Sequence, residues 1–142
     1  MALVGGGGAG NVAGGNPAGT GTTLNYIGDH CYAFSGMFAP ATSEYTMLNF
    51  STGSEYSLAK LTVSGAIDNA DPENGGVTVF TVTINSQEVM RIKVDTSLED
   101  MPTMETMPIL LEPHSKIEVT AIDSITVATR KTSASIVGRV YA

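Results

Sequence analysis

The chain has 142 residues, a formal net charge of −7 and 15% charged side chains. This length corresponds to one ordinary domain that can bury a core without a metal or disulfide staple, and a single cysteine, Cys31, excludes an intrachain disulfide framework. The acidic balance, with no basic stripe, excludes nucleic acid and anionic membranes as main partners, because binding to them depends on lysine and arginine that neutralise phosphates.

The amino-terminal segment, residues 1–24, differs in composition from the rest of the chain. Nine of the 16 glycines fall in it, and no charged side chain precedes Asp29. Such a segment cannot bury enough apolar surface to offset about 1–2 kcal/mol of backbone entropy per residue. We therefore expect a flexible glycine-rich arm over residues 1–24 and a body over residues 25–142. Fully extended, the arm could span on the order of 80 Å, which is enough to reach a neighbouring subunit.

The glycines of the arm allow a phosphate-binding interpretation and a protein-binding one. Gly5, Gly7 and Gly10 match G-x-G-x-x-G, but that loop must follow a buried strand and open a helix, and neither is predicted here. We prefer a structured interaction arm, since glycine lets two backbones approach closely, and a plain linker or tail is the alternative. The expected partner-binding residues of the arm are Gly5, Gly6, Gly7, Gly8, Asn11, Val12, Asn16 and Pro17.

The body consists of short segments rich in Val, Ile, Thr, Tyr and Phe, separated by Gly, Pro, Asn and Asp. No window has the apolar spacing of a helix longer than two turns. The predicted strands lie near residues 31–38, 45–51, 57–67, 76–84, 88–94, 107–112, 115–123 and 131–141, with a hairpin turn at 85–87. Eight strands at about ten-residue spacing predict an all-β fold, a single jelly-roll-like β-sandwich of antiparallel strands, and the last strand is expected to be well paired.

Alternation within the strands predicts which side chains enter the core. Met90, Ile92 and Val94 share one face of their strand, so they are expected to point inward. In the strand near 76–84 the apolar phase shifts between Val79 and Phe80. This shift predicts either a β-bulge at that point or a strand covered on both faces.

Candidate groups for catalysis are few. His30 and Cys31 are adjacent, so in a strand they point to opposite sides, and His114 lies in a turn before a strand. The acidic stretch 68–76 lacks the spacing of a calcium loop and is expected to be a solvated turn. We therefore expect no catalytic residue, no metal site and no cofactor.

A second candidate contact region lies between Lys93 and Lys116. It contains five acidic residues and no base, interleaved with Met101, Met104 and Met107. Methionine adapts to irregular surfaces, so these three residues are expected to form a pliable, acidic contact loop. The alternative is an ordinary long surface connection whose methionines cover the open end of the sandwich.

Four features together resemble a known class of proteins: the neutral glycine-rich arm, the hydroxyl-rich β body, a Leu-Glu-Pro-His-Ser-Lys-Ile-Glu-Val-Thr segment at 111–120, and a Gly-Arg-Val-Tyr ending at 138–141. The chain resembles small virion structural proteins of tailed bacteriophages, particularly capsid decoration (cement) proteins. The resemblance implies a small jelly-roll or β-tulip domain on a capsid shell, often a trimer, which clamps neighbouring capsomers with extended terminal arms. It implies no catalytic residues.

The hypothesis from the sequence is therefore a non-enzymatic virion protein, made in the host cytoplasm, that decorates and stabilises the capsid surface. Its expected partners are the major capsid protein and two further copies of itself in a homotrimer, with the arm contacting neighbouring subunits. The alternative is a phage fibre, spike or carbohydrate-binding β-sandwich module that recognises a host glycan.

Overall fold

The structure is a computed structural model that describes residues 24–68, 76–97, 103–127 and 129–141. Within these ranges the chain is all-β, with no helix. The strands are β1 (Asn25–Ile27), β2 (His30–Phe34), β3 (Tyr45–Ser51), β4 (Tyr56–Asp68), β5 (Val77–Ile84), β6 (Gln87–Asp95), β7 (Met104–Leu111), β8 (Lys116–Asp123) and β9 (Arg130–Tyr141).

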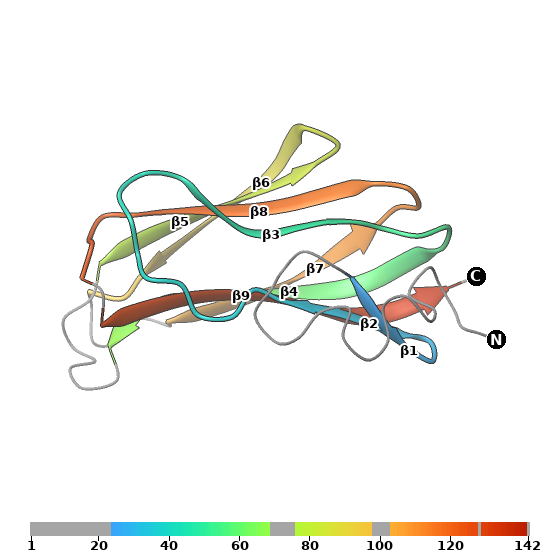
Figure 1. Ribbon diagram of the computed structural model, residues 1–142, viewed down its shortest axis with the longest axis horizontal. Coiled ribbons are helices and arrows are strands. Elements are labelled where there is room, and N and C mark those ends of the chain that lie inside the picture. Colours follow the sequence, from blue (N-terminus) through green and yellow to red (C-terminus); the bar gives the residue numbers. More distant parts are fainter. Residues whose placement is uncertain (1–23, 69–75, 98–102, 128, 142) are drawn as a thin grey trace.

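The strands form two antiparallel sheets that pack face to face (Figure 1). The five-stranded sheet has the order β1-β2-β9-β4-β7, and the four-stranded sheet has the order β3-β8-β5-β6. From β2 to β5 and again from β6 to β9, each successive strand crosses to the other sheet, except that β5 and β6 are joined as a hairpin within one sheet, as are β1 and β2. This connectivity, with eight strands after β1, is that of a jelly roll. The predicted all-β jelly-roll-like sandwich is confirmed.

The predicted strands agree with the observed ones except at two ends, and one strand was missed. The strand predicted near 31–38 ends at Phe34, because Gly36 adopts a φ of 75° and Phe38 forms only an isolated bridge. The strand predicted from residue 107 begins at Met104. The missed strand is β1, whose three residues pair with β2. Three residues are too few to show a period of two.

The core lies between the sheets, and alternation places its side chains there as predicted for β6. Ile92 and Val94 are buried and Met90 packs against the same cluster. The largest fully buried side chains come from both sheets, namely Phe80, Met47, Leu48, Leu61, Leu111, Ile117 and Ile136.

Of the two alternatives predicted for β5, a bulge between Val79 and Phe80 was wrong. Its burial alternates without interruption, with Thr78, Phe80 and Val82 inward, so the strand has no bulge between Val79 and Phe80. The apparent phase shift arose because one inward position is a threonine, whose hydroxyl is hydrogen-bonded inside the protein. The pairing of β5 with β6 shifts register instead between Val82 and Thr83, and the extra residue there is Val89 of β6.

The predicted hairpin turn between β5 and β6 is confirmed. Asn85 and Ser86 adopt φ values of 50° and 67°. Positive φ at both central residues matches the right-handed twist of a hairpin, which is why Asn is favoured there. The side chain of Asn85 also accepts a hydrogen bond from the backbone N–H of Lys116 at 2.8 Å, so the turn is tied to the start of β8.

The last strand, β9, lies in the interior of the five-stranded sheet, between β2 and β4. Residues 137–141 pair with Tyr56–Lys60 on one side, and 137–139 pair with His30–Tyr32 on the other. Deletion of residues 137–142 would leave residues 30–32 of β2 and residues 56–60 of β4 without the strand that lies between them, and it would remove the buried Val140. We expect this truncated chain to be insoluble or to lose its cooperative thermal transition, measured by circular dichroism. A soluble product that melts like the full chain would contradict the role of β9.

Candidate interaction face on the five-stranded sheet

The expected partner-binding residues of the arm, from Gly5 to Pro17, lie outside the described residues, as does Met101. The first residue that the structure describes is Leu24, which the sequence analysis assigned to the arm. Leu24 is only 3% exposed and belongs to the core cluster. The body therefore begins one residue earlier than expected. This position also places the end of the arm at β1, at one edge of the five-stranded sheet.

The structure corrects the prediction of one methionine-rich contact loop. Met104 and Met107 lie in β7 and not in a loop. They are three positions apart, and since side chains alternate along a strand, they point to opposite faces. Met104 is 55% exposed, whereas Met107 packs against the core. These two side chains therefore do not share a contact surface.

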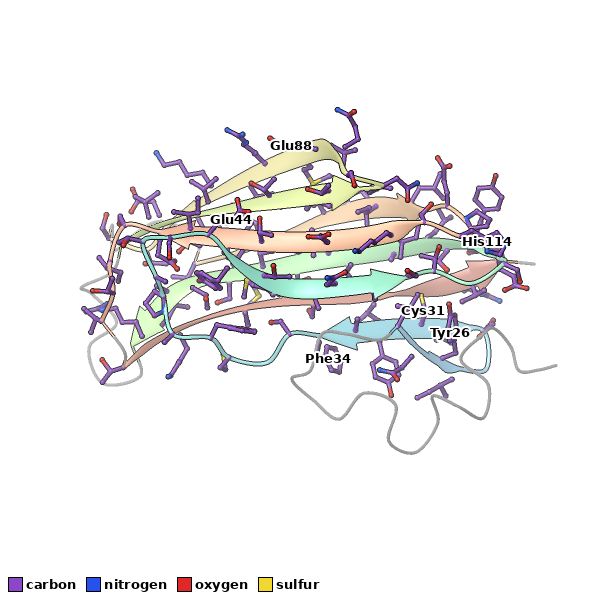
Figure 2. The ribbon with its side chains drawn as sticks, turned by 45° about the horizontal axis from the view of Figure 1, so that its top comes forward. Tyr26, Cys31, Phe34, Glu44, Glu88 and His114 are labelled. Atoms are coloured by element: carbon purple, nitrogen blue, oxygen red, sulfur yellow. The ribbon has the colours of Figure 1, made fainter. Side chains whose placement is uncertain are left out.

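The structure does not bring together the side chains considered for catalysis, which are His30, Cys31 and His114. Cys31 is fully buried, and burial raises the pKa of its thiol, which makes it a poor nucleophile. His30 is exposed and its Nδ1 lies 2.9 Å from Oδ1 of Asp29. His114 is an exposed turn residue with a φ of 53°. Figure 2 shows Cys31 directed into the sandwich.

The acidic stretch considered for calcium, residues 68–76, falls almost wholly outside the described residues. In the described part of the chain, no three His, Cys, Asp or Glu side chains gather in a way that could hold a metal ion.

Among the described residues, the outer face of the five-stranded sheet carries most of the large exposed apolar side chains. We call this surface the aromatic face and define it by outward residues of β2, β9, β4 and β7: Tyr32, Phe34, Tyr56, Leu58, Lys60, Pro108, Leu110, Val137, Arg139 and Tyr141. Figure 2 shows Phe34 on the side of its sheet that faces away from the four-stranded sheet. Monomeric proteins rarely expose contiguous apolar surface on this scale without a partner.

The strand register makes the aromatic face continuous. Tyr32 pairs with Val137, Val137 with Lys60, and Lys60 with Pro108, so these four side chains form one row across four strands. In the adjacent row, Arg139 pairs with Leu58, and Leu58 with Leu110. Leu58 and Leu110 are 55% and 47% exposed, and both line a shallow hollow between β4 and β7. Neighbours in a row are about 5 Å apart, close enough to act as one surface.

The charges of the aromatic face differ in sign from the charge of the whole chain. Its outward strand positions carry Lys60 and Arg139 and no carboxylate. The carboxylate of Asp29, in the turn before β2, lies 2.8 Å from the guanidinium of Arg139. That guanidinium also lies 5.7 Å from the ring centroid of Tyr141. Arg139 is thus held beside an aromatic ring, in an arrangement that favours a cation–π contact.

The outer face of the four-stranded sheet has a different character. One of its rows consists of Thr46, Thr120, Thr81 and Arg91. In the next row Glu118 pairs with Thr83, and Arg91 forms an ion pair with Glu88 of β6. Hydroxyl and charged side chains of this kind are readily solvated. The two outer faces are therefore unequal, and the apolar one is the candidate interaction surface.

A buried polar cluster at the end of the sandwich serves the fold rather than an interaction. The carboxylate of Asp123, 3% exposed, accepts hydrogen bonds from the hydroxyls of Tyr45 and Thr78 and, at 3.1 Å, from the backbone N–H of Ala41. The Tyr45 hydroxyl also lies 2.7 Å from that of Thr132. Burial, and then the hydrogen bond to Asp123, raise the pKa of Tyr45. The cluster ties the connection before β3 to β5, β8 and β9.

The comparisons with known proteins add little to this geometry. No protein-family model matches the chain, and no curated protein matches it either. Among solved structures that resemble it is the insecticidal delta-endotoxin Cry8Ea1 from Bacillus thuringiensis, with 8% sequence identity and a TM-score of 0.41. The similarity covers 71% of this chain and 19% of the toxin chain, so the chain spans about a fifth of that protein. In the described part of the chain, no helix is long and apolar enough to cross a membrane.

Proposed function

We propose that the chain is a non-enzymatic virion structural protein that decorates and stabilises a bacteriophage capsid by binding capsomers. In this proposal it acts as a homotrimer on the capsid surface, its partner is the major capsid protein, and the N-terminal arm contacts neighbouring subunits. The observation that carries the proposal is the one-sided aromatic face, a rigid sheet whose exposed apolar residues have no partner among the described residues.

The physical argument depends on how such a surface is used. A sheet held on its inner side by a packed core presents its outer side chains with little motion, so that binding orders few further groups. Affinity from a modest contact area is then multiplied when many copies bind one lattice and are linked to their neighbours. In a short body with one apolar face, that face is the surface that needs little ordering on binding. A long N-terminal extension can link each copy to its neighbours.

The test measures binding to capsid shells assembled without this protein. Leu58→Asp and Leu110→Asp place a carboxylate at the β4–β7 end of the aromatic face, beyond the contacts of the core. We expect each to reduce shell occupancy at least tenfold, because burying an unpaired charge in an apolar contact is unfavourable. The matched control is Ile122→Asp, since Ile122 is 42% exposed on the other sheet. Unchanged occupancy with both aromatic-face variants would contradict the proposal.

Two further measurements apply to the same proposal. Deletion of residues 1–22, which keeps the buried Leu24, should preserve the thermal transition and the oligomer but weaken shell binding. Light scattering should give about three times the 14.7 kDa of one chain. A monomeric mass would contradict the proposed trimer. Full shell binding by the deletion variant would contradict the proposed role of the arm.

A second candidate function is favoured by one observation. Tyr56 and Tyr141 are 53% and 46% exposed on the aromatic face, beside Arg139. Exposed tyrosines present both a ring face and a hydroxyl, the combination on which a sugar can stack and hydrogen-bond. A phage fibre or carbohydrate-binding module would bind a host glycan here. Glycan binding that is lost in Tyr141→Ser and kept after deletion of residues 1–22, without any shell binding, would favour this function.

A further inference from the structure

We propose that residues 12–23 dock on the β1–β2 end of the aromatic face of their own chain, where the side-chain amide of Asn25 donates a hydrogen bond to a backbone carbonyl of this segment. The proposal concerns the free protein and does not depend on the capsid hypothesis. It leaves residues 1–11 for neighbouring subunits, and it leaves Leu58 and Leu110, at the β4–β7 end, for another partner.

The first observation is the unexpected burial of Asn25. Asn25 pairs with Tyr32, whereas Tyr26 pairs with Cys31, whose side chain enters the core. Asn25 therefore points to the outer face, as does Ile27, two residues further along. Ile27 is 66% exposed, but Asn25 is only 3% exposed. An outward side chain on an edge strand is open to solvent unless another segment lies over it, so this corner of the sheet is a covered position.

The second observation is an unpaired donor at the same place. The Nδ2 atom of Asn25 is buried and has no hydrogen-bond partner among the described residues. Leaving such a donor unpaired costs about 1–3 kcal/mol, so buried amides almost always have an acceptor. A backbone carbonyl of a passing segment provides that acceptor.

The third observation is where the chain enters. Residues 1–23 lead directly into Leu24, whose side chain is anchored in the core, and into β1 at the edge of the face. Neighbouring strands lie about 4.8 Å apart, so β2 is close to the point where the segment joins β1. A few residues of the segment therefore suffice to cover Tyr32 and Phe34. Because the segment is covalently attached, its effective concentration at the face is in the millimolar range, which no free partner reaches at low protein concentration.

The chemistry of the segment fits the face better than a second copy of the face does. Residues 1–23 carry no charge, so docking leaves no ionised group unpaired, and Val12 and Pro17 can pack on the rings of Tyr32 and Phe34. Two aromatic faces placed against each other would bury the ammonium of Lys60 from both copies, and none of the residues that define the face is a carboxylate. Like charges in a desolvated contact are unfavourable.

The experiment is amide hydrogen exchange of the full chain at low micromolar concentration, read residue by residue by NMR. We expect amides within residues 12–23 to exchange at least tenfold more slowly than in a synthetic peptide of residues 1–23. Exchange at peptide rates across the whole segment would overturn the proposal. This measurement involves no capsid, so its failure is distinct from failure of shell binding.

Two variants and a control identify the contact. Asn25→Leu keeps the size of the side chain but removes the donor, so protection of residues 12–23 should fall several-fold. If nothing docks, the same variant removes an unpaired buried amide, and the expected result is equal or higher stability with no change in exchange. Phe34→Ser should reduce protection in the same way, whereas Ile122→Ser, on the outer face of the four-stranded sheet, should not.

A mixed sample separates docking within one chain from docking on a neighbour. A spin label attached to Ala18→Cys, beside Pro17 but not itself assigned to the contact, should broaden the Tyr32 and Phe34 signals of its own chain, while the buried Cys31 stays unlabelled. Spin-labelled chains without isotope are then mixed with isotope-labelled chains without a spin label. Broadening in this mixture would show a segment supplied by a second copy and would overturn docking within one chain.

Discussion

Replacing Gly138 with valine should abolish folding of the domain. Gly138 lies in β9 opposite Ala59 of β4 and Cys31 of β2, in the interior of the five-stranded sheet. A Cβ atom at this position would lie 2.5 Å from both the Cβ of Ala59 and the carbonyl oxygen of Leu58. These are backbone or near-backbone atoms of a central strand, so neither can move without displacing β4. Overpacking of a core typically costs about 1–3 kcal/mol, and a rigid contact such as this one places the cost at or above the upper limit.

The measurement is the soluble yield and the thermal transition of Gly138→Val, with Gly138→Ala as a smaller step in the same direction. Gly28 offers the matched control, because its φ is 59° and no atom lies within 4 Å of a Cβ built there. Gly28→Ala should therefore cost only the strain of the left-handed conformation, about 1–2 kcal/mol. Equal melting temperatures for the Gly138 and Gly28 alanine variants would show that the contact at Gly138 relaxes.

Replacing Asp123 with alanine is expected to have the second-largest effect, a loss of about 3 kcal/mol in the free energy of unfolding. The substitution removes the acceptor for Thr78, which is fully buried, and for the backbone N–H of Ala41. It also removes one of the two hydrogen-bond partners of the Tyr45 hydroxyl, and the hydroxyl of Thr132 remains as the other. The result should appear as a fall in melting temperature of about 10 °C, measured by calorimetry.

Tyr45→Phe supplies the control for the Asp123 variant and a pH readout. It keeps the ring in the core and removes only the hydroxyl, so we expect a loss of about 1 kcal/mol near neutral pH. Because the pKa of Tyr45 is raised in the folded state, the contribution of its hydroxyl to stability is fully present below the ordinary tyrosine pKa of 10.0 and is lost as the pH rises above that value. The stability difference between the wild type and Tyr45→Phe should therefore shrink above pH 10. A larger loss for Tyr45→Phe than for Asp123→Ala would contradict the central role of the carboxylate.

Much of the fold could be predicted because strand signals are local. Alternation placed Ile92 and Val94 in the core, and an Asn-Ser pair between two strong strands marked the hairpin at 85–86. The exceptions have local causes too. Thr78 is inward because Asp123 supplies its partner, and that partner is 45 residues away in sequence. No pattern within 76–84 contains this information.

The candidate interaction face could not be predicted, although each of its strands was. Leu58, Val137 and Leu110 are ordinary members of apolar stretches, and in each stretch a similar side chain points the other way, such as Ile136 beside Val137. A signal was available in the outward positions of residues 56–60, which read Tyr, Leu and Lys. The methionine-rich stretch is the more conspicuous pattern in the sequence, but Met104 and Met107 lie on opposite faces of β7.

The sequence by itself determined that the chain is a β-sandwich, where eight of the nine strands of the described residues lie, and that most of its glycines fall in a segment without charged side chains. A period of two decides which side chains share a face of one strand, because that property depends only on the local backbone. The tertiary structure alone decided that β2, β9, β4 and β7 are neighbours, in a register that gathers their outward residues into the aromatic face. The physical reason is that strand order and register depend on pairings between residues far apart in the chain, which the global packing of both sheets selects.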